Sequence, residues 1–156
     1  RLGGGSLCAV LLPAWGQPKT AQAVVLSIST AGSGQRIDFE MAALERLPQV
    51  SFTTATPWYS QPTKFTGPSL RDVLAAAGAR GSQLVAEALN DYKVTMPLED
   101  TVRRGAIVAI RVNDKPIAVR DKGPLFVVFP FDTASELQTE RYYNRSIWQL
   151  RSLRAE

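Results

Sequence analysis

From residue 24 onward, the chain consists of short segments in which apolar and polar residues alternate, and clusters of Gly, Pro, Asn and Asp separate these segments. Alternation with a period of two is typical of half-buried strands, and those four residue types are typical of turns. Helical spacing is confined to two short stretches, Met41–Leu47 and Leu70–Ala77. The pattern therefore predicts an α+β domain in which short helices accompany a strand-rich mixed sheet.

The expected elements follow from these segments. We expect strands over residues 24–29, 35–39, 50–56, 83–89, 92–96, 106–112, 125–129 and 146–153. Ser69 is the expected N-cap of the second helix, Gly78 is its expected end, and Glu99–Arg103 forms a single helical turn. Residues 57–68, with three prolines, are expected to form a long loop, and residues 130–144 are expected to be irregular.

Length and composition fit one globular domain over residues 24–156. The 156-residue chain is 45% hydrophobic and 21% charged, and these are ordinary globular values. Its net charge is +4, and the sequence contains no run of five like charges. Both features argue against a nucleic-acid surface. The chain has no histidine and a single cysteine, Cys8, so His-based triads, Cys/His zinc sites and an intramolecular disulfide are excluded.

Residues 1–23 have the pattern of a signal peptide remnant. Arg1 precedes a short apolar run, Leu7–Trp15, and Ala21–Ala23 has the A-x-A form of a cleavage site. The apolar run is too short to span a bilayer as a helix. We therefore expect an exported, periplasmic protein with no membrane span in its mature part. The alternative is a disordered Gly/Pro-rich extension of a cytoplasmic protein.

Several segments of the chain match the pattern of one known family. They are Phe65–Leu70, Ala88–Tyr92, Met96–Asp100, Asp121–Leu125, Pro130 and Ser146–Leu150. In their order and spacing, over about residues 24–154, they resemble the oxidoreductase molybdopterin-binding domain of the sulfite oxidase family. The chain is most similar to the short, stand-alone, exported members of this family, and the resemblance implies their fold.

The resemblance also directs attention to the groups that hold the family's cofactor. Catalytic members bind molybdenum through a cysteine thiolate at the end of the strand before the long loop, but Ser51–Thr56 here contains no thiol. No arginine follows in the segment Gly123–Phe126, and Ile147 stands where a lysine usually precedes the terminal tryptophan. A hydroxyl is a poor substitute for a thiolate on molybdenum. We therefore expect no cofactor and no metal site.

Three segments supply candidate binding residues. The candidates are Thr54, Thr56, Trp58, Asn90, Asp91, Tyr92 and Lys122. The resemblance implies that the strand end, the loop around Trp58 and the Asn90–Tyr92 turn border one concavity, with Asp91 favouring a cationic or donor-rich ligand. Other interpretations remain open, because Asn90–Tyr92 also fits a simple turn and Trp58 also fits a hydrophobic plug.

Two further segments have competing interpretations. Lys122 lies in a segment that resembles a family element near the cofactor, yet the same residues fit a tight turn with Gly123 at positive φ. Residues 142–145 fit either a binding strip or the entry to a strand, and Trp148 is expected to be a core residue of the last strand.

Two functions are consistent with these features. The first is an exported, non-catalytic binding domain for a small molecule or for a membrane sensor protein. The alternative is a molybdopterin-dependent oxidoreductase that holds its cofactor without a cysteine ligand. The missing thiolate favours the first function, and no residue is nominated as catalytic.

Overall fold

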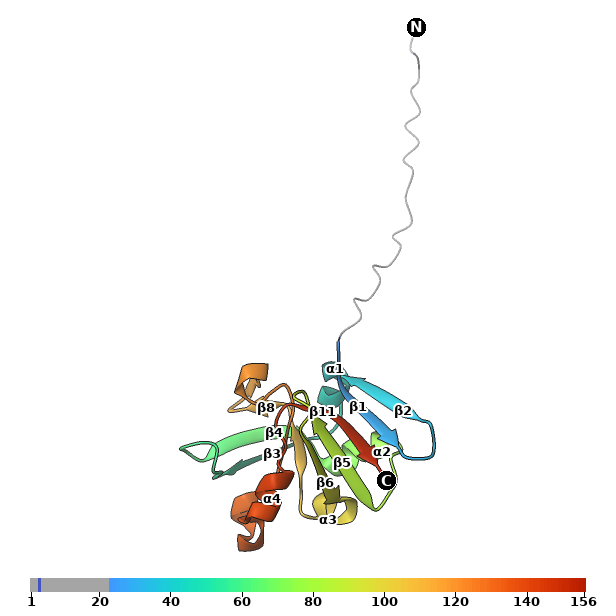
Figure 1. Cartoon of the computed structure of the whole chain (residues 1–156). Coiled ribbons are helices and arrows are strands. Elements are labelled where there is room, and N and C mark those ends of the chain that lie inside the picture. The colour runs from blue at the N-terminus through green and yellow to red at the C-terminus, as the bar shows by residue number, and fades with distance from the viewer. Residues whose placement is uncertain (1–2, 4–22) are drawn as a thin grey trace.

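The computed structural model describes residue 3 and residues 23–156, so the expected signal peptide lies almost entirely outside the described residues. The described chain forms one α+β domain (Figure 1). The strands of a five-stranded sheet lie on one side of the domain, and β3, β4 and β8 lie on the other. This arrangement confirms the strand-rich α+β class.

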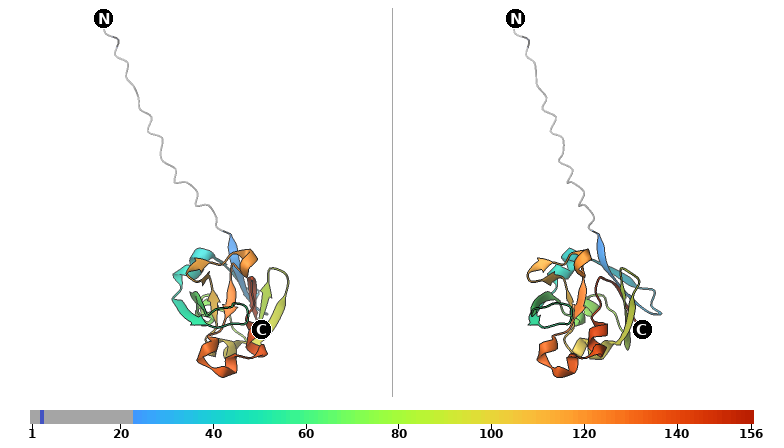
Figure 2. Two further views of the ribbon diagram at one scale, coloured as in Figure 1. Left: turned by 90° about the vertical axis from the view of Figure 1, so that its left-hand side faces the viewer. Right: turned by 60° about the vertical axis from the view of Figure 1, so that its left-hand side comes forward.

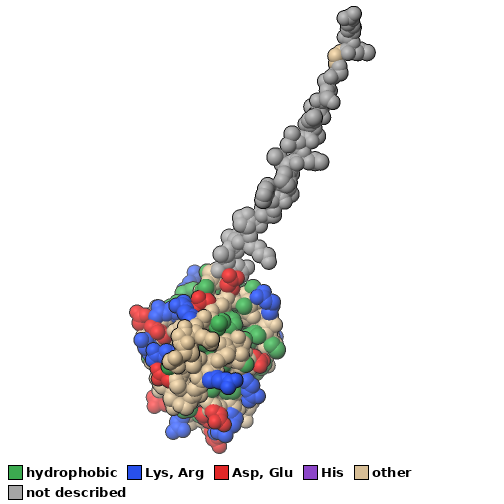
Figure 3. Space-filling model, turned by 90° about the vertical axis from the view of Figure 1, so that its right-hand side faces the viewer, with side chains coloured by type: hydrophobic (Ala, Val, Ile, Leu, Met, Phe, Trp, Pro, Cys, Tyr) green, Lys and Arg blue, Asp and Glu red, His purple; other side chains and the backbone are tan. Residues whose placement is uncertain are grey.

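The larger sheet has the strand order β2-β1-β11-β5-β6. Its strands are β1 (Val24–Thr30), β2 (Arg36–Glu40), β5 (Gln83–Ala88), β6 (Lys93–Pro97) and β11 (Leu150–Ala155). β1 is parallel to β11, and the other neighbouring pairs are antiparallel. Leu26 and Ile28 of β1 are buried, whereas Ser27 between them points to the uncovered face and meets Asp38 of β2. The side of the molecule that carries β2 shows acidic and basic side chains interspersed (Figure 3).

A second group of strands forms the other side of the domain. The strands are β3 (Gln49–Thr54), β4 (Thr63–Pro68), β7 (Ile107–Ala109), β8 (Arg111–Val112), β9 (Lys115–Pro116) and β10 (Phe126–Val128). They make a four-stranded sheet, β3-β4-β8-β9, and a separate buried pair, β10-β7. Every residue of β7 and β10 is buried, so this pair lies in the core of the domain.

Two expectations for this region are wrong. Residues 57–68 are not one long loop, because β4 occupies their second half and pairs with β3 along its whole length. Pro62 before β4 and Pro68 at its end favoured a loop, although buried and half-buried residues alternate from Thr63 to Gly67. Residues 106–112 form two strands rather than one, since Ile110 leaves the ladder and its N–H bonds to the carbonyl of Thr66 in β4.

Four short helices and three 3₁₀ turns complete the fold. The helices are α1 (Met41–Arg46), α2 (Leu70–Ala76), α3 (Leu98–Arg103) and α4 (Glu140–Arg145), and the 3₁₀ turns are η1 (Val119–Asp121), η2 (Phe131–Thr133) and η3 (Ser135–Leu137). The Ser69 hydroxyl accepts the N–H of Asp72 as the expected cap of α2, and Gly78 follows at φ +62°. None of the helices in the described part of the chain is long and apolar enough to cross a membrane.

The C-terminal third departs most from expectation. Residues 130–144 are not irregular, since η2, η3 and α4 follow one another there and gather at one end of the domain (Figure 2). The last strand begins at Leu150 rather than at residue 146, because Gln149 has a left-handed backbone, φ 51°. Trp148 is consequently outside the strand and 38% exposed, so its assignment to the core is wrong.

Candidate functional site

The site is an open pocket of about 250 Å³ at the end of the domain that carries α4. Three stretches that are distant in sequence form it: the loop after β3, the β5–β6 turn and the link from α4 to β11. Its walls are Trp58, Ala88, Asn90, Tyr92, Tyr143, Asn144, Ser146, Ile147, Trp148 and Gln149. We call this set the aromatic pocket.

Trp58 is both a wall of the aromatic pocket and part of the packed interior. Its ring meets four other aromatic rings nearly edge-on, with centroid distances from 5.5 Å to Phe126 to 6.0 Å to Phe131. Tyr143 and Trp148, the other two partners, also line the pocket. Such edge-to-face pairs add stability beyond the area that they bury. The packing agrees with the interpretation of Trp58 as a hydrophobic plug, and its place in the pocket wall leaves the ligand-wall interpretation as a prediction.

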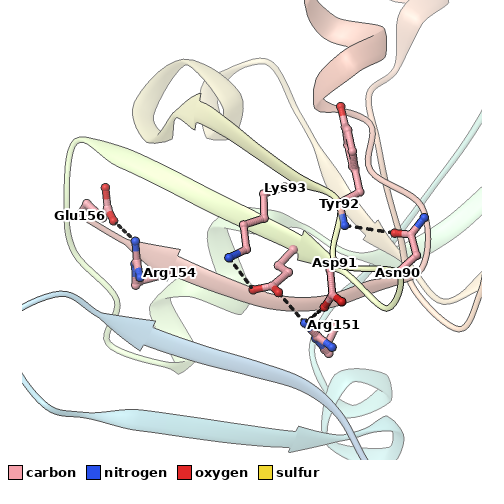
Figure 4. A network of polar contacts seen from close by, with 8 residues as sticks. Asn90, Asp91, Tyr92, Lys93, Arg151, Arg154 and Glu156 are labelled. Atoms are coloured by element: carbon pink, nitrogen blue, oxygen red, sulfur yellow. Dashed lines mark hydrogen bonds and ion pairs between the residues drawn. The ribbon is translucent and has the colours of Figure 1, made fainter.

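The side chains of the β5–β6 turn point in two directions, towards the aromatic pocket and towards Arg151. Asn90 and Tyr92 line the aromatic pocket, and the Tyr92 N–H donates to Asn90 Oδ1 at 3.3 Å. Asp91, at φ 67°, lies away from the pocket and accepts a hydrogen bond from Arg151 at 2.9 Å (Figure 4). Arg151 also bonds to Glu87. Asp91 is thus held in an ion-pair network and does not line the pocket.

Lys122 lies beside the aromatic pocket without lining it. Its Nζ is 4.7 Å from the ring centroid of Trp148 and 5.1 Å from that of Tyr59, which places the ammonium group between two aromatic rings. Cations are attracted to such ring faces. Lys122 is also the left-handed residue of its turn, with φ 85°, so the expectation that Gly123 has positive φ is wrong.

The two candidate threonines do not line the pocket. Thr54 is buried, and its Oγ1 accepts the N–H of Asp132 at 3.0 Å while Asp132 Oδ2 accepts the N–H of Ala55. This reciprocal pair fixes the end of β3 against η2. Thr56 Oγ1 is buried and has no hydrogen-bond partner within the described residues.

The donors at this strand end do not fit a molybdenum ion. The sequence has one cysteine, Cys8, which lies outside the described residues, and the strand end offers only hydroxyls. Within the described part of the chain, no group of three Cys, His, Asp or Glu side chains is placed to hold a metal. Thr54 Oγ1 is already engaged with Asp132. A metal that the family holds through a thiolate therefore has no thiolate ligand among the described residues.

Most of the pocket was not predicted from the sequence, although residues 142–145 fitted a binding strip. Seven of the ten lining residues were not among the candidates: Ala88, Tyr143, Asn144, Ser146, Ile147, Trp148 and Gln149. The sequence signal for these residues is the concentration of Tyr, Asn and Trp over residues 142–149. No apolar stripe accompanies them that would assign them to the core.

Asp100 of α3 holds α4, and hence the α4 side of the pocket, in place. Its Oδ2 accepts hydrogen bonds from Tyr142 at 2.9 Å and from Arg145 at 2.8 Å, and the Arg145 side chain is only 11% exposed. Burial raises the pKa of Asp100, but the hydrogen bonds from Arg145 and Tyr142 outweigh that effect, so the pKa lies below its ordinary value.

We expect Asp100→Ala to lower the free energy of unfolding by about 2 kcal/mol at pH 7, because it removes the carboxylate that accepts a charge-assisted hydrogen bond from Arg145. A carboxylate with a lowered folded-state pKa stabilises the protein above its unfolded-state pKa, about 4, and that contribution is lost as pH falls through the folded-state pKa. The difference between wild type and variant should therefore shrink as pH falls below about 4. Urea unfolding between pH 3 and pH 7 measures this, with Glu99→Ala on the same helix as control. A difference that persists unchanged at pH 3 would contradict the assignment.

The comparisons with known proteins agree with this architecture. The chain is similar to a chain in the crystal structure of the sulfane dehydrogenase SoxCD from Paracoccus pantotrophus, with a TM-score of 0.63 and 21% identity. The match covers 83% of this chain and 37% of that chain, so this chain spans little more than a third of the other's length. No curated protein sequence matched.

A family model gives the assignment. The model described as the oxidoreductase molybdopterin binding domain matches residues 16–136, which is most of the chain. This confirms the family expected from the sequence, and the fold agrees with the sulfite oxidase type. The chain therefore belongs to the oxidoreductase molybdopterin-binding domain family.

Proposed function

We propose that this chain is a non-catalytic member of its family and that the aromatic pocket binds a small molecule. The observation that carries the proposal is the composition of the pocket walls. Four aromatic side chains and three side-chain amides line it, and none of its residues is Asp, Glu, Lys or Arg. Aromatic walls with a few polar groups are the usual make-up of a ligand site. Of the side chains used for general acid–base chemistry, the pocket walls offer only the phenols of Tyr92 and Tyr143.

The donor set supports the proposal against the oxidoreductase alternative. When bound, a molybdopterin would supply redox chemistry at its metal, and family members hold that metal by a thiolate. The strand end here carries Thr54, whose hydroxyl is engaged with Asp132. Two cations lie beside the pocket among the described residues, and both are engaged: Lys122 packs against Tyr59 and Trp148, and Arg145 pairs with Asp100. We therefore propose that neither molybdenum nor a pterin is the ligand.

We expect protein purified from a molybdenum-replete host that makes the cofactor to contain far less than one molybdenum per chain. The physical reason is the absence of a thiolate at the end of β3. Elemental analysis of the full chain measures the metal, and mass spectrometry of the denatured supernatant measures any pterin. Near-stoichiometric molybdenum would favour the oxidoreductase function instead.

Binding in the pocket can be followed through the protein's own tryptophans. Trp58 and Trp148 both line the pocket, so a ligand that enters it should change their fluorescence. The direct test is mass spectrometry of compounds that copurify with wild type and are absent from Tyr92→Ala protein. A membrane sensor protein that contacts the exposed Tyr92 and Trp148 would then detect the bound state. If nothing copurifies and no compound changes the fluorescence, the binding function is wrong.

We also propose that the protein is exported and that its mature form begins near Val24. The support is the apolar run before Ala21–Ala23 and the start of β1 at Val24. Mass analysis of the native protein should give an N-terminus close to Val24. A soluble periplasmic form that retains Cys8 would contradict this proposal.

A further inference from the structure

We propose that the aromatic pocket binds an uncharged saccharide, whose ring packs on Tyr92 or Trp148 and whose hydroxyls bond to Asn90, Asn144 and Gln149. This inference rests on the proposed binding function and names its ligand class.

The first argument is the absence of charge in the pocket walls. Neither a carboxylate nor an ammonium or guanidinium group is among the lining residues. A charged ligand group that loses water in such a pocket finds no counter-charge in the pocket walls, and burying an unpaired charge is costly. Lys122, beside Trp148, adds a positive charge near the pocket and further disfavours a cationic ligand. The pocket is therefore suited to a neutral ligand.

The second argument is the hydrogen-bonding capacity that the amides retain. The Asn144 side chain is exposed and makes no hydrogen bond among the described residues. Gln149 uses its Nε2 to donate to the Val119 carbonyl, which leaves Oε1 as an acceptor. Asn90 uses Oδ1 to accept from the Tyr92 N–H, which leaves its amino group as a donor. The pocket therefore offers donors and acceptors together, and a hydroxyl is a neutral group that both donates and accepts.

The third argument is the exposure of the aromatic walls. Tyr92 is 50% exposed and Trp148 is 38% exposed, so both rings present apolar area to a ligand. A sugar ring has an apolar face of C–H groups that can cover such a ring and a rim of hydroxyls that can reach the amides. A purely hydrocarbon ligand would cover the rings but leave the amides without partners, which costs affinity. Among neutral ligands, saccharides match both features.

The test uses the full chain, purified and stripped of small molecules by dialysis. Cellobiose, maltose and N,N′-diacetylchitobiose are the neutral probes, glucuronic acid is the anionic control, and indole and benzoate are aromatic controls. We expect at least one neutral disaccharide to change the tryptophan fluorescence saturably and to release heat in calorimetry. We expect glucuronic acid to bind at least ten-fold more weakly.

Variants then locate the site. Asn144→Ala should weaken disaccharide binding roughly three- to ten-fold, the range for one lost hydrogen bond, and Tyr92→Ala should weaken it roughly ten-fold or more. Both side chains are exposed, so the thermal midpoint should stay within a few degrees of wild type, which separates loss of binding from loss of fold. Gln35→Ala, in the exposed β1–β2 turn, is the matched control and should bind as wild type does.

The outcomes distinguish the two proposals. If indole or benzoate binds in the pocket and no neutral disaccharide does, the saccharide inference is overturned while the binding function stands. If disaccharides bind but Asn144→Ala and Tyr92→Ala bind as tightly as wild type, the ligand lies elsewhere and the inference is also overturned. If no probe and no copurified compound binds, the binding function itself fails.

Discussion

Replacing Trp58 by alanine should lower the free energy of unfolding by about 3–5 kcal/mol, the range for truncating a large buried aromatic residue. The ring is only partly exposed and packs against the main core. It meets four aromatic rings from β10, η2, α4 and the link before β11. Because these rings come from four different segments, the cavity left by the substitution cannot close through the movement of one side chain.

Tyr92→Ala is the matched control for Trp58→Ala. Tyr92 lines the same pocket but is half exposed, so its truncation should cost within about 1 kcal/mol. Urea unfolding followed by circular dichroism measures both, since the Trp58 variant would lose one of the three tryptophans that report by fluorescence. Equal and small losses in the two variants would show that Trp58 is only a ligand wall.

The second large effect is expected at Gly67, the last residue but one of β4. A Cβ at this position would lie 2.0 Å from the Val108 carbonyl oxygen and 2.9 Å from the Ala109 Cα, and both atoms belong to the backbone of β7. Since no flexible side chain can move aside, Gly67→Ala must push two buried strands apart. We expect a loss of roughly 4 kcal/mol or more, which would leave little soluble folded protein.

Gly34→Ala provides the comparison for Gly67→Ala. Gly34 has φ +68° in the β1–β2 turn, with open space around its Cα, so alanine there meets only backbone strain of about 1–2 kcal/mol. Yield of soluble protein and thermal unfolding distinguish the two variants. If Gly67→Ala were as stable as Gly34→Ala, the close approach of β4 to β7 would be wrong.

The strand pattern of the sequence predicted most of the fold, because alternation is a local property. The pattern failed at β4, where Pro62 and Pro68 suggested a loop. It also failed at α4, because two adjacent tyrosines are the only large apolar residues of Glu140–Arg145 and they form no helical stripe. The predicted α+β class is nevertheless correct, because β4 adds a strand and pairs with β3. The family resemblance supplied the overall arrangement that local patterns do not contain.

The pocket was harder to predict, because its walls come from three separated stretches of chain. The sequence did place Trp58 and the β5–β6 turn together by resemblance, and the structure brings Trp58, Asn90 and Tyr92 to one pocket. Asp91 was assigned to the same face, yet its left-handed backbone turns it towards Arg151. Which side chain of a tight turn faces a pocket depends on such dihedral angles, and composition does not reveal them.

The parallel pairing of β1 with β11 has a consequence for how this protein can be synthesised. The central strand of the five-stranded sheet is the last one made, and Leu150–Ala155 must join β1 to β5 before the sheet is continuous. Contacts between such distant parts of a chain slow folding, because a long loop must close first. A nascent polypeptide that ends before Leu150 has only two unconnected hairpins from this sheet, β1-β2 and β5-β6, so the sheet cannot become continuous until β11 has been made.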